Sequence, residues 1–120
     1  MPARNAYVVF LTEHFAPLGA ITARPMFGGH CLYCDGYVFA IVARNALFLK
    51  TDDANRSRFV ERKLEPFRPF EDKAEVMSYY QAPAEIFEDD EAMREWVTPS
   101  IEASKRSRSP RPRARARKAR

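Results

Sequence analysis

The chain has 120 residues, of which 46% are hydrophobic and 12% aromatic, which is enough to bury the core of one domain. Its apolar runs are shorter than the roughly 20 residues that cross a bilayer, and the N-terminus lacks the pattern of a signal peptide. These features exclude a membrane-spanning protein, and we expect a soluble, cytoplasmic one. Two cysteines are too few for a disulfide framework, and a reducing compartment would keep them as thiols.

Charge is divided unevenly along the chain. Nine of the 20 Lys and Arg residues lie in residues 104–120, which contain no acid, so 11 remain against all 16 acids. Residues 1–103 therefore carry a net charge of about −5, and residues 104–120 carry about +9. We expect an acidic folded domain over residues 1–103 and a basic tail over residues 104–120.

The first predicted element is a helix over residues 5–18, where apolar residues recur at helical spacing and Pro17 with Gly19 supplies an end. From Ile21 the apolar period changes and predicts a first strand that continues to Cys34. Gly28-Gly29 within this strand permits a bend or a bulge, because glycine tolerates the required backbone angles.

A hairpin is predicted next. Asp35-Gly36 is a favoured two-residue turn, since both of its central positions take positive φ. The chain then returns as a strand over residues 37–43, turns at Arg44-Asn45 and continues as a strand over residues 46–50. These segments predict three successive antiparallel strands.

A second helix and two more strands follow. Thr51, Asp52 and Asp53 provide the oxygen atoms and negative charge that suit a helix N-terminus, and residues 52–63 have an amphipathic pattern. Residues 67–70 predict a strand, placed at a sheet edge by Pro69, and residues 76–80 predict another.

The last predicted helix begins near Asp89-Asp90, after a short helical turn that Pro83 opens. Pro99 should kink or end this helix, because proline lacks the N–H that the helix needs. The helix buries one face, formed by Met93, Trp96, Val97 and Ile101. The complete order is α-β(3)-α-β(2)-α, which predicts an α+β fold with helices packed on one antiparallel sheet.

Several short motifs occur in a specific order along residues 5–103. They are Met26-Phe27-Gly28-Gly29, Asp35-Gly36, Leu47-Phe48-Leu49-Lys50, Asn55-Arg56, Pro66-Phe67, Met77-Ser78-Tyr79 and Glu95-Trp96. In this order the sequence resembles the N-terminal domain of the TfoX/Sxy family of bacterial proteins.

The resemblance implies an α-β(3)-α-β(2)-α domain of the type III secretion chaperone-like architecture, in agreement with the predicted elements. It also implies a place in transcriptional regulation of competence genes. That role belongs to longer members, which carry a second domain where this sequence has its basic tail. The resemblance brings no catalytic residues, and it implies that other residues are common at positions 31 and 34.

Cys31 and Cys34 form a Cys-x-x-Cys pair beside His30, which raises the possibility of a metal or redox site. A structural zinc site needs four N or S ligands, and the chain adds only the distant His14. Residues three apart on a strand point to opposite faces, and redox pairs normally start a helix. We therefore expect ordinary strand cysteines and no bound metal. Metal binding between subunits and oxidation sensing stay open, and a thiol titration with and without a chelator tests both.

No other group of residues predicts chemistry. The acidic cluster Glu88-Asp89-Asp90-Glu91 lies where a helix N-terminus favours negative charge, and His14 lies near a helix end. No Ser/His/Asp arrangement and no Gly-x-Ser-x-Gly motif is present. We expect no enzyme activity and no cofactor.

The tail carries the strongest functional signal. Its composition offers few apolar side chains to bury, so we expect it to be disordered. Arg pairs with phosphate through two hydrogen bonds, which favours sequence-independent contact with DNA or RNA. A solvated extension, or one that folds back on the acidic domain, is the alternative. The residues expected to contact nucleic acid are Lys105, Arg106, Arg108, Arg111, Arg113, Arg115, Arg117, Lys118 and Arg120.

Two functions follow as hypotheses. The first is a non-enzymatic TfoX-like regulatory or adaptor protein whose domain binds a partner or a second copy while the tail contacts nucleic acid. The second is a chaperone-like protein-interaction module without nucleic-acid binding, which would use a sheet face or edge. Whether the purified protein carries nucleic acid before a high-salt wash distinguishes them.

Overall fold

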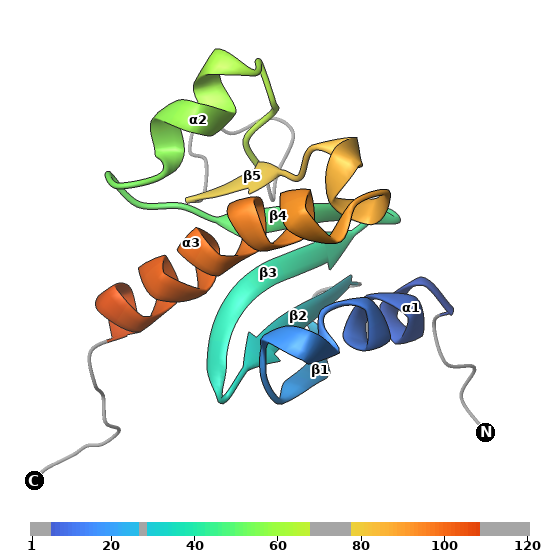
Figure 1. The fold of residues 1–120 in the computed structure, drawn as a ribbon. Coiled ribbons are helices and arrows are strands. Elements are labelled where there is room, and N and C mark those ends of the chain that lie inside the picture. The colour runs from blue at the N-terminus through green and yellow to red at the C-terminus, as the bar shows by residue number, and fades with distance from the viewer. Residues whose placement is uncertain (1–5, 27–28, 68–77, 109–120) are drawn as a thin grey trace, which may run out of the picture.

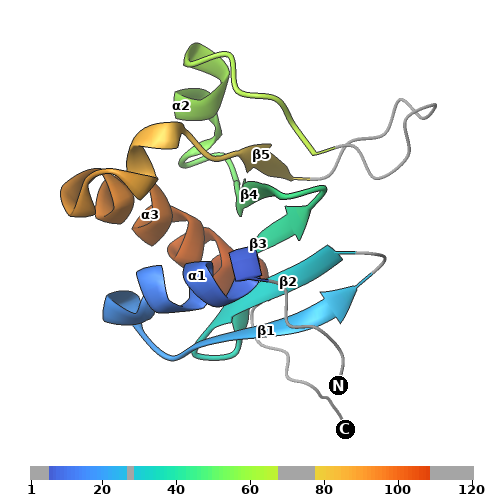
Figure 2. The ribbon, with the colours of Figure 1, turned by 90° about the vertical axis from the view of Figure 1, so that its right-hand side faces the viewer.

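The computed structural model describes residues 6–26, 29–67 and 78–108. Helices α1 and α3 pack on one face of an antiparallel sheet, as the side view shows (Figures 1 and 2). This arrangement confirms the predicted α+β class. The elements are α1 (Ala6–His14), η1 (Ala16–Leu18), β1 (Ile21–Met26), β2 (Gly29–Cys34), β3 (Tyr37–Ala43), β4 (Ala46–Lys50), α2 (Arg56–Glu61), β5 (Tyr79–Gln81), η2 (Ala84–Phe87) and α3 (Asp90–Arg108), where η marks a short 3-10 helix.

The sheet has five strands in the order β1-β2-β3-β4-β5, each antiparallel to its neighbours. The predicted first strand is in fact two strands, because Met26 of β1 pairs with Gly29 of β2. The reversal falls at residues 27–28, which lie outside the described residues. A side chain at Gly29 would collide with the carbonyl oxygen of Val42 on β3, so this position requires glycine.

Residues 65–67 lie along the outer side of β5. The N–H of Phe67 donates to the carbonyl of Tyr79 at 2.8 Å, and the N–H of Gln81 donates to the carbonyl of Glu65 at 2.8 Å. Pro66 occupies the bridge position between these two bonds, where no N–H is needed. Residues 68–77, and with them Pro69 and most of the two predicted strands, lie outside the described residues.

Both predicted two-residue turns are confirmed. Asp35 and Gly36 have φ values of 53° and 89°, and Arg44 and Asn45 have values of 52° and 60°. The Asp35 carboxylate also accepts a hydrogen bond from the N–H of Ala20 at 3.0 Å. This bond attaches the start of β1 to the β2–β3 hairpin.

A bulge in β3 adds one more side chain to the core between the sheet and the helices. Leu32 pairs with Ala40 while Tyr33 pairs with Val38, so Phe39 is the extra residue. Phe39 and Ala40 are consequently both buried in the core between the sheet and the helices. Phe39 makes an edge-to-face contact with Phe15, with ring centroids 5.8 Å apart. This core includes Leu11, Leu32, Leu49, Phe59, Ile86, Met93, Trp96, Val97 and Ile101.

Helix α3 runs through Pro99, so the predicted alternative that the helix ends at this residue is wrong. Proline has no N–H, so the carbonyl of Glu95 loses its usual donor within the helix. Arg58 of α2 supplies the missing donor, with its guanidinium nitrogen 2.9 Å from this carbonyl oxygen. The same guanidinium lies 4.3 Å from the centre of the Trp96 ring. Helix α2 therefore satisfies the site that proline leaves open.

Helix α3 also passes the predicted domain boundary at residue 103 and ends at Arg108. Ser104 is buried, and its hydroxyl donates to the carbonyl of Ile101 at 2.8 Å. The helix therefore continues five residues past the predicted boundary, and the side chains of residues 105–107 are exposed. Residues 109–120 of the predicted tail lie outside the described residues. None of the described helices is long and apolar enough to cross a membrane.

Candidate binding face and basic helix end

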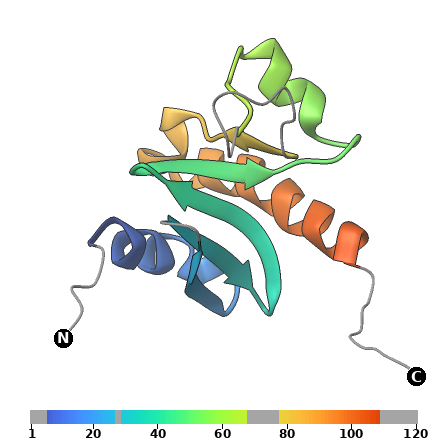
Figure 3. The ribbon, with the colours of Figure 1, turned by 180° about the vertical axis from the view of Figure 1, so that it is seen from behind.

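The sheet face opposite α1 and α3, which is turned toward the viewer in Figure 3, is here called the second face. Aromatic and apolar side chains gather on it. Strand residues alternate between the two faces, so this set is separate from the helix-covered core. Its buried centre consists of Cys31, Ile41, Phe67 and Tyr79, and the half-buried side chains around it are Met26, Tyr33, Val38, Ala43 and Phe48.

Strand register orders the second face in rows. One row crosses all five strands and contains Arg24, Cys31, Ile41, Phe48 and Gln81. Toward the β2–β3 turn, Thr22, Tyr33 and Val38 pair across β1, β2 and β3, and Lys50 pairs with Tyr79 across β4 and β5. Two half-buried rings, those of Tyr33 and Phe48, thus lie on strands separated by β3.

Contacts within the second face hold its aromatic side chains in place. The rings of Phe48 and Phe67 have centroids 5.0 Å apart, and the Lys50 ammonium lies 5.2 Å from the centre of the Tyr79 ring. Burial raises the pKa of Tyr79 to about 12, with smaller contributions from Cys31 and Tyr33. Burial also lowers the pKa of Lys50, which Asp52 partly opposes.

A hollow of about 320 Å³ opens at the end of the second face away from the β2–β3 turn. Phe48 and Phe67 supply aromatic walls, while Arg44, Glu65 and Gln81 supply polar groups. The hollow therefore offers both apolar contact and hydrogen-bonding groups. Ala43, Ala46 and Pro66 complete its lining.

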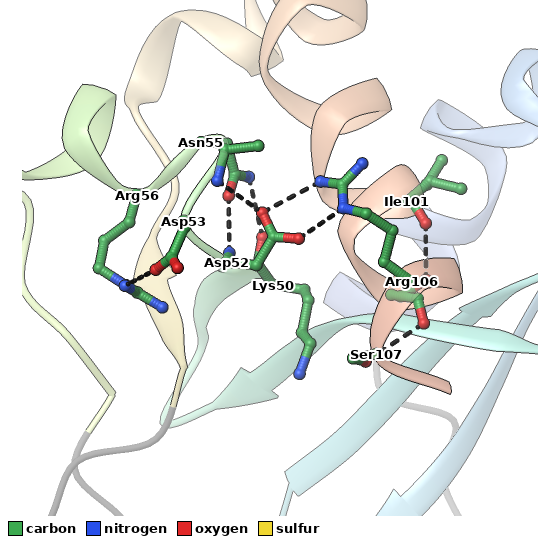
Figure 4. A network of polar contacts seen from close by, with 10 residues as sticks. Lys50, Asp52, Asp53, Asn55, Arg56, Ile101, Arg106 and Ser107 are labelled. Carbon is green, nitrogen blue, oxygen red and sulfur yellow. Dashed lines mark hydrogen bonds and ion pairs between the residues drawn. The ribbon is translucent and has the colours of Figure 1, made fainter. Parts of the chain in front are cut away.

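The basic end of α3 is attached to the sheet at two points. Arg106 forms two hydrogen bonds with the Asp52 carboxylate, of 2.7 Å from Nε and 3.0 Å from the terminal nitrogen (Figure 4). Hydrogen bonding to Arg106 lowers the pKa of Asp52. The Lys105 ammonium lies 5.8 Å from the centre of the Tyr37 ring, at the start of β3.

Asp52 belongs to a tight turn that begins α2. Its N–H donates to Asn55 Oδ1 at 2.8 Å, and its own carboxylate accepts from the N–H of Ala54 at 2.9 Å. The turn displaces the helix start from the predicted residue 52 to Arg56. Because this turn fixes the carboxylate, Arg106 meets a rigid partner.

Two of the nine basic residues predicted to contact nucleic acid therefore have partners within the domain. Lys105 lies against Tyr37, Arg106 pairs with Asp52, and Arg108 is the last residue of α3. Composition gave no signal for the Arg106 pair, because 54 residues separate the partners. The other six lie outside the described residues: Arg111, Arg113, Arg115, Arg117, Lys118 and Arg120.

Cys31 and Cys34 point to opposite faces of the sheet, as the strand alternation predicted. Cys31 belongs to the second face, where its sulfur lies 3.1 Å from that of Met26, and Cys34 belongs to the main core. Both are free thiols, and burial raises the pKa of each. The two sulfurs of one chain therefore cannot share a metal ion or join in a disulfide.

The histidines and the acidic cluster lie where the sequence placed them. His14 ends α1 and donates from Nε2 to the carbonyl of Ile86 at 2.7 Å. His30 lies beside Cys31 on β2, and its Nδ1 is buried with no hydrogen-bond partner among the residues described. Asp89 accepts from the backbone N–H groups of Glu91 and Ala92, which confirms that the cluster caps α3.

The motif residues named in the sequence analysis lie in strands, turns and packing contacts of the domain. Met26 ends β1, the carbonyl of Ser78 accepts from the N–H of Thr51 at 2.8 Å, and Trp96 packs edge-to-face on Phe59 with centroids 5.0 Å apart. Gly29, Asp35, Gly36 and Tyr79 have the strand and turn positions given above. Phe27 and Gly28 lie outside the described residues.

Comparison with known proteins identifies the family of the chain. The family model of the TfoX N-terminal domain matches residues 13–104. No curated protein matches the sequence. The family match spans most of the chain and ends within α3, before the most basic residues begin. The chain therefore belongs to the TfoX N-terminal domain family.

Proposed function

We propose that the chain is a non-enzymatic regulatory or adaptor protein of the cytoplasm, whose basic C-terminal residues contact DNA or RNA while the folded domain binds a protein. The observation that carries this proposal is the charge division, about −5 for residues 1–103 against about +9 for residues 104–120. Family membership supports a part in transcriptional regulation, which the resemblance implies for longer members.

Electrostatics favours a nucleic-acid partner for the basic residues. Six Lys or Arg residues lie among the 12 residues after Arg108, with no acid between them. Neutralising phosphates with such residues releases condensed counterions, so affinity falls steeply with salt. The segment has no aromatic side chain and no predicted recognition helix, so it would bind without sequence preference.

Attachment of α3 supports the same proposal. The Arg106 pair with Asp52 and the Lys105 contact with Tyr37 fix the point from which the remaining basic residues start. A basic segment that starts from a fixed point brings the domain to whatever the segment binds. The domain would then deliver its protein partner to nucleic acid.

Fluorescence anisotropy of a labelled DNA duplex and a labelled RNA strand, measured across a salt series, tests the proposal. In the tail-neutral variant, Arg111, Arg113, Arg115, Arg117, Lys118 and Arg120 are changed to Gln. We expect the wild type to bind, with log affinity for the duplex falling by about 0.9 per neutralised phosphate per log unit of salt. We expect the tail-neutral variant to bind at least tenfold more weakly.

A control for charge removal outside the tail changes two exposed basic residues of the domain, Lys63 and Arg94, to Gln. This control should bind like the wild type if the tail makes the contacts. Absence of binding by the wild type at low salt would overturn the proposal. Equal losses in the control and the tail-neutral variant would show a general charge effect instead.

A second candidate, the protein-interaction module without nucleic-acid binding, has its own observation in its favour. Phe10 of α1 is 44% exposed, with its ring 5.4 Å from His14 and 6.1 Å from Phe87. Beside these rings lies a hollow of about 340 Å³ lined in part by Tyr7 and Phe87. Light scattering of wild type and Phe10→Ser tests this surface, because a concentration-dependent dimer lost in the variant would place a second copy there.

A further inference from the structure

We infer that the second face binds single-stranded nucleic acid, with the rings of Tyr33 and Phe48 stacking on unpaired bases. The inference rests on the proposed function, since it takes the basic tail to bring the strand. To the proposed function it adds the class of nucleic acid, which is single-stranded, and the surface that contacts the bases. The tail alone explains attraction to phosphates but offers no ring for a base.

Both rings are exposed enough to be reached and supported enough to stay in place. Tyr33 on β2 and Phe48 on β4 are half-buried, and buried side chains such as Ile41 lie between them. Neighbouring strands are about 4.8 Å apart, so two strands place the rings about 10 Å apart across the sheet. That separation allows each ring to take a base of its own.

Charge on the second face suits a phosphate backbone. Arg24 lies in the Phe48 row on β1, the outer strand of the described sheet, and Lys50 lies two residues after Phe48 on β4, paired with Tyr79. Across the described strands, the Phe48 row and the residues paired with Tyr33 or Lys50 include no acidic residue. Beside Phe48, the 320 Å³ hollow offers Gln81 and Glu65 as hydrogen-bonding groups for a base edge.

The basic tail begins near one end of the second face. Helix α3 ends against Tyr37 and Asp52, which lie at the end of the sheet that carries Tyr33. The 12 residues that follow Arg108 span up to about 40 Å when extended. This length is enough for the segment to contact phosphates of a strand that lies on the second face.

Stacking requires bases that are not paired with a partner strand. In a duplex the base faces are covered by neighbouring base pairs, whereas unpaired bases can lie on aromatic side chains of a sheet. We therefore expect the second face to bind single strands in preference to duplexes. The tail, which contacts phosphates, is expected to bind both.

The test uses the full-length protein with a labelled oligouridine strand and a labelled duplex of equal length. The variants are Tyr33→Leu and Phe48→Leu, which keep an apolar side chain at each position. The matched control is Phe10→Leu, which removes an exposed ring from α1. Circular dichroism and the melting temperature check that each variant is folded.

We expect each ring variant to weaken single-strand binding roughly fivefold or more, because stacking on one aromatic ring contributes about that factor. Duplex binding and the salt dependence should be unchanged, and Phe10→Leu should bind like the wild type. Single-strand binding that survives both ring changes, while the tail-neutral variant loses it, would overturn this inference and leave the proposed function intact. Failure of the wild type to bind either probe would overturn both.

A second measurement needs no variant. Photocrosslinking of a 4-thiouridine strand to the wild-type protein, followed by mass spectrometry, identifies the contacted residues directly. We expect crosslinks on the peptides that contain Tyr33 or Phe48. Crosslinks restricted to residues 109–120 would contradict the inference even if a ring variant had failed to fold.

Discussion

On one face of the sheet, α1 and α3 bury large side chains such as Phe39 and Leu32 completely. On the other face, Tyr33 and Phe48 are only partly buried, around a small buried centre. The same five strands supply both faces, so strand geometry does not cause the difference. The difference follows from helix packing, because α1 and α3 cover only the first face.

The sharpest way to test this contrast is to remove one aromatic ring from each face. Phe39→Ala should destabilise the protein by about 3–5 kcal/mol, because the ring is fully buried and leaves a cavity. Phe48→Ala should cost clearly less, since its ring is already partly in water. Guanidinium unfolding of both variants gives the two values, and equal losses would show that the second face is as tightly packed as the first.

A second prediction concerns alkaline pH and the centre of the second face. Burial raises the pKa of Tyr79 from 10.0 to about 12, so the folded state holds this proton more firmly than the unfolded chain does. The stabilisation that comes from a protonated Tyr79 hydroxyl is complete below pH 10 and is lost as pH rises through about 12, a loss of about 3 kcal/mol. In Tyr79→Phe the fall in stability over this range should be smaller. An identical loss of stability in both proteins would show that the Tyr79 hydroxyl is in contact with water.

A third prediction tests how α3 stays on the covered face. Arg58→Met should destabilise the protein by about 1–2 kcal/mol, because it removes the hydrogen bond to the Glu95 carbonyl and the contact with Trp96. Pro99→Ala restores the helical donor to that carbonyl, so the loss from Arg58→Met should shrink in its presence. Thermal unfolding of the double-mutant cycle measures this coupling, and strictly additive losses would contradict it.

Local features of the fold were predictable from the sequence, whereas features that depend on distant residues were not. The turns at Asp35-Gly36 and Arg44-Asn45 were predicted because their backbone angles are set by the turn residues themselves. Gly28-Gly29 fits a bulge as well as a reversal, and only the pairing of β1 with β2 distinguishes them. The helix continues through Pro99 because Arg58, 37 residues before Glu95, supplies the donor.

In the candidate site, too, local features were predictable from the sequence and features that depend on distant residues were not. Composition alone identified the basic segment, because a run of Lys and Arg without acids needs no structure to be recognised. Strand alternation gave the opposite orientations of Cys31 and Cys34. Which face the helices cover, and hence which rings stay exposed, depends on packing across the whole domain. Alternation along β4 places Phe48 and Lys50 on the same face, but no local pattern indicated that Tyr33 on β2 would share that face.

The smallest expected effect concerns the contact that fixes the basic end of α3. Hydrogen bonding to Arg106 lowers the pKa of Asp52 below its ordinary value of 3.8, so the carboxylate stabilises the folded state when ionised. This contribution is present above about pH 4 and is lost as pH falls through the lowered pKa. Because both side chains are partly exposed, water and salt weaken the pair.

Asp52→Asn should therefore change the stability only slightly at pH 7. The variant should also lose less stability in acid than the wild type, as urea unfolding between pH 2 and 7 would measure. If the variant retains the wild-type acid dependence, other carboxylates cause that dependence, and the end of α3 is held mainly by burial of Ser104 and the side chains before it.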